Sequence, residues 1–102
     1  MKETQAALDK FHDAVLETVT FDWGSAKAEL RLRLSVEPPA RCVVTIEGVT
    51  AVLCPRKNEW GPSESVNEAD LEAEGKRLVI HMQSGDDLVF EGEVVRVQST
   101  PT

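Results

Sequence analysis

Hydrophobic and polar residues alternate over most of this chain, which is the pattern of β-strands. The clearest run covers residues 26–36, where every second position from Ala28 to Val36 is apolar and most of the positions between are charged. Because successive side chains of a strand point to opposite faces, this run predicts a strand with one apolar face. A weaker alternation over residues 15–23 predicts the strand that precedes it.

These two strands form a predicted hairpin around Gly24-Ser25. A two-residue loop there pairs Phe21 with Ala28 and Val19 with Leu30, so that both apolar sets lie on one face. A shift of one residue would turn one of these sets toward water. Glycine at the first loop position favours a type II′ turn.

The first residues show a different period. Leu8, Phe11 and Val15 fall on one stripe at helical spacing, and Thr4 is a candidate N-cap. We therefore expect a helix over about 4–14.

Residues 41–54 are strand-like throughout but contain Gly48. If Glu47-Gly48-Val49 is a tight loop, Cys42 lies opposite Cys54. If Gly48 is instead a bulge in one long strand, the two cysteines lie roughly 40 Å apart and cannot bridge. The bulge collects more apolar side chains on one face, so we favour it. We expect both cysteines to be buried and reduced.

The stretch 55–75 is rich in Gly, Pro, Ser, Asn and Glu, and predicts an irregular loop. Its middle part, 67–74, could form a helical turn or two. Its acidic residues are too dense to predict a strand.

A second hairpin follows, with strands over 76–83 and 88–97. The apolar residues of the two strands lie on one face only if the loop has an odd number of residues. We place this loop at Gly85-Asp86-Asp87, so that Met82 pairs with Phe90. In this register His81 lies opposite Glu91, and Gly92 faces Ile80. The alternation breaks after Gly92, which predicts a bulge between 92 and 95, and the end after residue 98 should be frayed.

Five to six short strands joined by hairpins predict a mainly β (α+β) fold. We expect one domain over 1–102, an antiparallel hairpin meander closed into a sandwich or half-barrel, with the single N-terminal helix over one end. An exposed edge strand would allow a monomer or a homodimer.

The charge of the chain narrows its possible partners. With 18 acidic and 11 basic residues, the net charge is −7. Phosphate contacts need a surplus of Lys and Arg, so we expect no binding to nucleic acid or to a membrane surface. A basic protein partner fits better. With no membrane-length apolar run and no export signal, we expect a cytoplasmic protein.

Candidate chemistry is sparse. His12 and His81 lie outside any spaced ligand cluster, and a pair between His81 and Glu91 would be structural. Ser84-Gly85-Asp86-Asp87 resembles a metal loop but lacks the further oxygens that a hard cation needs. We therefore predict no catalytic residue, no metal site and no cofactor.

The most informative polar segment surrounds Trp60. An indole between glycine and proline either covers the sheet as a plug or anchors a partner. In the anchor interpretation, acidic neighbours supply a negative rim. The candidate binding residues are Trp60, Glu59, Glu64, Glu68, Asp86 and Asp87.

Several short motifs resemble those of small bacterial proteins. They are Phe21-Asp22-Trp23, Gly48-Val49, the segments 60–63 and 66–68, and 82–86. Some of these proteins are similar to the immunity proteins of polymorphic-toxin systems. The resemblance implies a protein-binding role and no defined catalytic residues. The leading hypothesis is therefore a non-enzymatic module that binds a protein, and the resemblance implies an immunity-type role for it. The alternatives are a small-ligand-binding β-domain and an enzyme without a recognisable motif.

Overall fold

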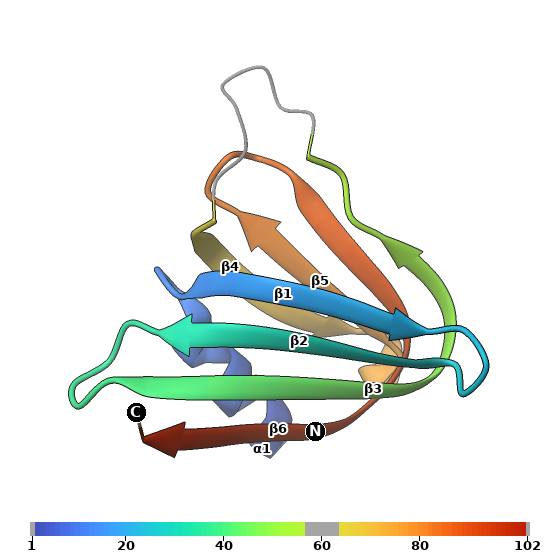
Figure 1. The fold of residues 1–102 in the computed structure, drawn as a ribbon, viewed down its shortest axis with the longest axis horizontal. Helices are drawn as coiled ribbons and strands as arrows, with labels where there is room; N and C mark the ends of the chain where they lie inside the picture. Colours follow the sequence, from blue (N-terminus) through green and yellow to red (C-terminus); the bar gives the residue numbers. More distant parts are fainter. Residues whose placement is uncertain (1, 57–63, 102) are drawn as a thin grey trace.

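The computed structural model describes residues 2–56 and 64–101. Within these residues, six antiparallel strands form a single sheet (Figure 1). Its strand order is β1-β2-β3-β6-β5-β4. The elements are α1 (Lys2–Leu8), the 3₁₀ helix η1 (Asp9–Phe11), β1 (Val15–Asp22), β2 (Lys27–Leu34), β3 (Ala40–Leu53), β4 (Val66–Glu72), the 3₁₀ helix η2 (Ala73–Gly75), β5 (Arg77–Met82) and β6 (Asp87–Pro101).

The two edge strands of this sheet meet at one corner. Val15 at the start of β1 forms an antiparallel bridge with Ser65, just before β4. The Leu16 N–H donates to the Glu64 carbonyl at 2.8 Å, and the Val66 N–H donates to the Ala14 carbonyl at 2.8 Å. The sheet is thus curled and joined at one end, which confirms the mainly β fold and agrees with the half-barrel, one of the two predicted architectures. It is not a simple meander, because β4 follows β3 in the chain but lies at the far edge, beyond β6 and β5.

The register of the first hairpin is confirmed, but its turn is not. Phe21 pairs with Ala28 and Val19 with Leu30. The positive φ expected at Gly24 belongs instead to Ala26, at 54°, so the type II′ prediction was wrong. The turn is closed by the Ala26 N–H, which donates to the Trp23 carbonyl at 3.4 Å, and by the Asp22 carboxylate, which accepts from the Ser25 N–H.

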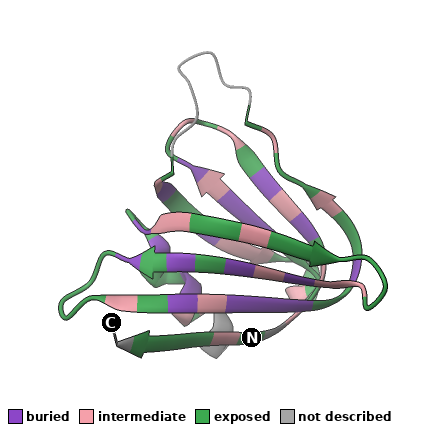
Figure 2. Ribbon diagram, viewed as in Figure 1, coloured by how far each residue is buried: buried purple, intermediate pink, exposed green. Residues whose placement is uncertain are grey.

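The outer part of this hairpin is not buried. Trp23 is 87% exposed and Phe21 39% exposed, with their rings packed edge to face. The core-facing alternation predicted for the second strand holds along β2, where every second residue from Ala28 to Leu34 is buried (Figure 2).

A bulge at Gly48 bends β3, as predicted. Gly48 has a φ of 61°, a conformation that glycine adopts without steric cost. The β3–β6 register jumps from Glu47–Glu93 to Ala51–Glu91, so residues 48–50 oppose the single residue Gly92. Beyond the bulge the predicted apolar face is lost, because Leu53 is 60% exposed.

The course of β3 explains why the two cysteines differ in burial. Both are free, with Cys42 buried in the core and Cys54 exposed beyond the end of β3. The expectation that both are buried was therefore wrong for Cys54, because β3 has already left the core when the chain reaches it.

Strand β4 corrects the prediction of an irregular loop over 55–75. It pairs with β5, and a register shift between Val66 and Glu68 breaks its apolar alternation, which hid it in the sequence. Its free edge is bound by a side chain from α1: the Leu71 N–H donates to Gln5 Oε1 at 2.9 Å, and Gln5 Nε2 donates to the Ala69 carbonyl at 3.2 Å. The acidic side chains that argued against a strand lie largely at the surface.

The loop of the second hairpin has an odd number of residues, as predicted, but it lies two residues earlier in the chain than predicted. Leu78 pairs with Phe90 and Ile80 with Leu88, so the predicted pairing of Met82 with Phe90 was wrong. His81 consequently faces Asp87 and not Glu91. The loop moves because the Met82 N–H donates to the Asp86 carbonyl at 2.9 Å, which makes residues 83–85 the turn.

Strand β6 is longer than predicted. It bulges at residue 95, inside the predicted interval, and then pairs with β3 as far as Ala40–Pro101, where fraying had been expected. Gly92 faces the β3 bulge and not Ile80, because the register of β5 and β6 differs from the predicted one.

The N-terminal helix is shorter than predicted and begins before Thr4, so Thr4 is not its N-cap. α1 and η1 together end at Phe11. Leu8 and Phe11 are fully buried in the core that the curled sheet surrounds. Among the described residues, no helix has the length and apolar character needed to span a bilayer.

Gly92→Ala should destabilise the fold. A Cβ there would lie 3.0 Å from the Glu47 carbonyl oxygen and 3.1 Å from the Val49 Cα, backbone atoms that cannot rotate away. We expect a loss of about 1–3 kcal/mol in urea unfolding. Gly24→Ala is the matched control, since its Cβ would have Asp22 Oδ1 at 3.6 Å as its nearest neighbour. Equal unfolding midpoints for the two variants would contradict the close packing of β6 under the bulge.

Candidate functional site

Three segments distant in the sequence are hydrogen-bonded together where the edges of the sheet meet. The Asp13 N–H donates to the Val66 carbonyl at 2.8 Å, and the Gln83 N–H donates to the Ser65 carbonyl at 2.9 Å. The Gln83 side-chain amide donates to Asp13 Oδ1 and, at 3.2 Å, to the Val66 carbonyl. One glutamine therefore connects the start of β1, the start of β4 and the β5–β6 loop.

His12 lies beside this network on the surface. Its Nδ1 is 2.7 Å from the Asn67 carbonyl oxygen, and its Nε2 is 3.6 Å from Asp13 Oδ2. The side chain is 66% exposed, so the imidazole is largely solvated.

The β5–β6 loop is held by its own polar groups. Ser84 Oγ donates to Asp86 Oδ2 at 3.0 Å, and the Asp86 N–H donates back to Ser84 Oγ at 3.3 Å. These bonds account for the Ser-Gly-Asp-Asp motif as turn chemistry.

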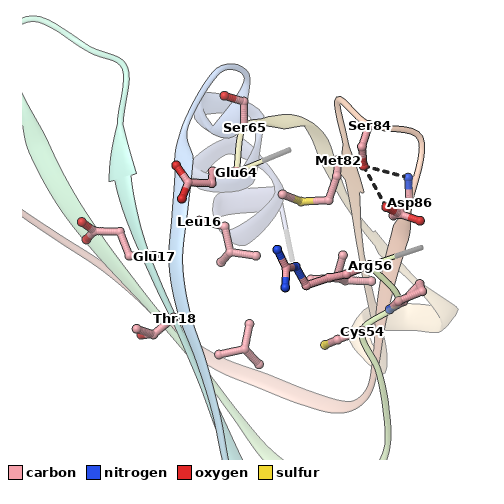
Figure 3. A pocket seen from close by; sticks show the side chains of 13 residues that line it. Leu16, Glu17, Thr18, Cys54, Arg56, Glu64, Ser65, Met82, Ser84 and Asp86 are labelled. Carbon is pink, nitrogen blue, oxygen red and sulfur yellow. Dashed lines mark hydrogen bonds between the residues drawn. The ribbon is translucent and has the colours of Figure 1, made fainter. Parts of the chain in front are cut away.

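A pocket of about 800 Å³ opens beside this network (Figure 3). Its walls come from β1, from the chain just after β3, from the residues before β4, and from the β5–β6 hairpin. The lining residues are Leu16, Glu17, Thr18, Val19, Cys54, Pro55, Arg56, Glu64, Ser65, Met82, Ser84, Asp86 and Leu88.

The pocket combines an apolar lining with charged groups. Leu16, Met82 and Leu88 supply apolar surface. Arg56 reaches from the β3 side into the space toward Leu16 (Figure 3). No ion pair within the described residues neutralises Glu64 or Asp86, whereas Glu17 lies 3.7 Å from Arg41.

Cys54 contributes a free thiol to this wall. Burial against its neighbours raises the pKa of its thiol, although the residue keeps exposed surface. A thiol with a raised pKa is protonated at neutral pH and is a weak nucleophile.

A second cluster of polar side chains lies around His81. His81 Nδ1 is 2.8 Å from Asp87 Oδ1, and Nε2 is 3.2 Å from Asp70 Oδ2. Glu68 completes the group, since its carboxylate, that of Asp70 and the imidazole each place a donor atom within 4.8 Å of the others. The hydrogen bond to Asp87 raises the pKa of His81, and the Asp70 carboxylate adds to this while partial burial opposes it.

The structure divides the predicted binding residues between two places. Glu64 and Asp86 lie on the pocket, whereas Glu68 and Asp87 lie beside His81. Trp60 and Glu59 lie outside the described residues.

Sequence reasoning did not identify Arg56 or Asp70 as site residues. Arg56 follows a strand end and carries no local signal. Asp70 would have been found if β4 had been recognised, because the period of two places it on the same face as Glu68.

Comparisons with protein-family models, with curated proteins and with solved structures find no match. The resemblance to immunity proteins therefore stays a prediction.

Gln83→Ala should loosen the corner where the sheet edges meet. The substitution removes the side-chain bonds to Asp13 and Val66, and we expect a loss of about 1 kcal/mol of stability in urea unfolding. Amide hydrogen exchange should also accelerate at Leu16 and Val66, whose N–H groups join the edges. Gln98→Ala, an exposed glutamine on β6, is the control and should leave both measurements unchanged. Unaltered exchange in Gln83→Ala would mean that the side chain does not hold this corner.

Proposed function

We propose that the protein is a non-enzymatic binding module that receives a basic protein segment at the pocket beside the β5–β6 hairpin. The observation that carries the proposal is the combination of apolar lining with two carboxylates, Glu64 and Asp86, that have no ion-pair partner within the described residues. Lys and Arg side chains match such a surface, because they bury an aliphatic stem while their charged head meets a carboxylate.

The charge of the whole chain supports the same partner. A net charge of −7 attracts a basic protein over distance and speeds the encounter, in a manner that salt weakens. Arg56 adds selectivity, because its guanidinium repels a purely cationic partner and can pair with one carboxylate among the partner's basic residues. The two free thiols are compatible with the cytoplasmic setting that belongs to the proposal.

A small-ligand-binding role is the second candidate, and the size of the pocket favours it. About 800 Å³ lies within the range of roughly 300–1,000 Å³ found for small-molecule sites. A protein segment would use the open mouth and the surrounding acidic surface, whereas a small ligand would be held by the lining alone.

Binding of a short fluorescein-labelled peptide of alternating arginine and leucine, with one glutamate in place of a central arginine to pair with Arg56, tests the main proposal. We expect Glu64→Gln combined with Asp86→Asn to weaken binding by about tenfold in fluorescence anisotropy, because two charge contacts are lost. The amides of Leu16, Met82 and Leu88 should shift in NMR spectra of the wild-type complex. A glutamate–leucine peptide should not bind.

The control variant carries the same change of charge elsewhere. Glu74→Gln combined with Glu91→Gln removes two exposed carboxylates that do not line the pocket. If this control weakens binding as much as the pocket variant, the attraction is diffuse and the proposed site is wrong. If a small amine shifts the same amides and the peptide shifts none, the small-ligand role replaces the main proposal.

The immunity-type role can be tested through the neighbouring gene. If that gene encodes a toxin domain, co-expression of this chain should restore growth, and the Glu64→Gln, Asp86→Asn variant should restore it less than the control variant does. Absence of a toxin gene beside this one in related genomes would count against the immunity role, while leaving peptide binding to be judged separately.

A further inference from the structure

The His81 cluster is built from three neighbouring strands. Glu68 on β4 pairs with His81 on β5, and His81 pairs with Asp87 on β6. Asp70 lies two residues beyond Glu68 and so projects from the same face of β4. The backbone hydrogen bonds of the sheet therefore hold all four residues in place, which is the kind of rigid support that a binding site requires.

The imidazole is oriented by one carboxylate and faces two others. Asp87 Oδ1 lies 2.8 Å from Nδ1 and holds that nitrogen as a donor, which leaves Nε2 facing Asp70, 3.2 Å from its Oδ2, while Glu68 places a carboxylate oxygen within 4.8 Å of the donor atoms of both. The side chain of His81 is only 29% exposed, whereas that of Asp70 is 43% exposed. The histidine is thus sheltered within the sheet surface, and the carboxylates can still rotate.

This arrangement matches the way proteins hold first-row divalent metals. A histidine that binds a metal through one nitrogen donates its other N–H to a carboxylate, which fixes the ring and raises its basicity. Zinc sites with three protein ligands leave a fourth position open, at metal–ligand distances of about 2.0–2.2 Å. The donor atoms of His81, Asp70 and Glu68 already lie within 4.8 Å of one another, so side-chain rotations alone bring them to a shared ion.

We propose that Glu68, Asp70 and His81 Nε2 form a binding site for a first-row divalent cation such as Zn²⁺, with Asp87 as the positioning residue behind the imidazole. A mixed nitrogen and oxygen donor set suits such ions better than Ca²⁺, which takes oxygen ligands only. The cation takes the place of the proton that Nε2 shares with Asp70 in the metal-free protein. This site is separate from the pocket, so it stands independently of the proposed binding function.

Titration of the EDTA-treated chain of residues 1–102 with ZnCl₂ tests the proposal. Calorimetry should show one saturable site. His81→Gln should lower the affinity by about a hundredfold or more, and Asp70→Asn should lower it by a clear margin. In NMR spectra of the wild-type protein, Zn²⁺ should shift the Nε2 resonance of His81 and leave its Nδ1 resonance nearly unchanged.

His12→Gln is the matched control. It removes the other histidine, which also lies beside an aspartate but is 66% exposed and outside the cluster. Its affinity for Zn²⁺ should equal that of the wild type. Equal losses in His12→Gln and His81→Gln, no saturable heat at millimolar Zn²⁺, or a shift at Nδ1 in place of Nε2 would each overturn the proposal.

Two substitutions at Asp87 separate positioning from folding. Asp87→Ala removes the acceptor for Nδ1 and should weaken binding by about 10- to 100-fold. Asp87→Asn keeps an oxygen that accepts the same hydrogen bond and should recover most of the affinity. If both variants bind as the wild type does, Asp87 has no positioning role. If His81→Gln lowers the unfolding temperature, its loss of affinity could come from lost stability. The Zn²⁺-induced shifts of Nε2 and Nδ1 in the wild-type protein then decide whether His81 binds the ion.

Discussion

The long pairing of β3 with β6 shapes the rest of this fold. Both strands carry a bulge, and at the larger one residues 48–50 of β3 oppose Gly92 alone. The missing side chain lets the two backbones approach closely, while the extra residues of β3 force it to bend. The ladder of β3 with β2 ends at the pair Ala28–Ile46, the Val49 N–H still donates to the Ala26 carbonyl at 2.9 Å, and β3 then continues along β6. The sheet consequently curls around its core instead of lying flat.

The pocket is a consequence of this curl. The C-terminal part of β3 extends beyond the start of β2 and so leaves the β1–β2 pair, and the described edges of the sheet meet at the corner of Val15 and Ser65. The space between is lined by apolar side chains of β1 and of the β5–β6 hairpin, with Arg56, Glu64 and Asp86 around them. The His81 cluster depends on a different part of the same sheet, where β4, β5 and β6 run side by side. The pocket and the His81 cluster are thus separate products of one architecture.

Much of the fold could be predicted, because its strands alternate where they cover the core. The register of the first hairpin followed from the requirement that Phe21 and Val19 share a face with β2, and the bulge at Gly48 followed from the same reasoning. Prediction failed where the alternation of apolar residues along the chain does not reveal how the strands pair. The alternation of β4 is broken by its own bulge, and the strand is completed by β5 and by the Gln5 side chain from α1. The loop of the second hairpin has the predicted odd length but lies two residues earlier in the chain. Both loop positions put the same side chains on the core face, so the alternation of apolar residues does not distinguish between them.

The candidate sites, too, were only partly predictable from the sequence. Glu64, Glu68, Asp86 and Asp87 were selected from the sequence for their charge, yet charge did not indicate that they separate into two pairs, one at a pocket and one at a histidine. Arg56 and Asp70 could not be identified before the ends of β3 and β4 were placed. By itself the sequence determined the β class, the first hairpin register, the bulges of β3 and β6 and the acidity, because these depend on periodicity and composition within short stretches. Only the tertiary structure decided which carboxylates meet His81 and which meet the pocket, because those distances depend on how the curled sheet brings distant strands together.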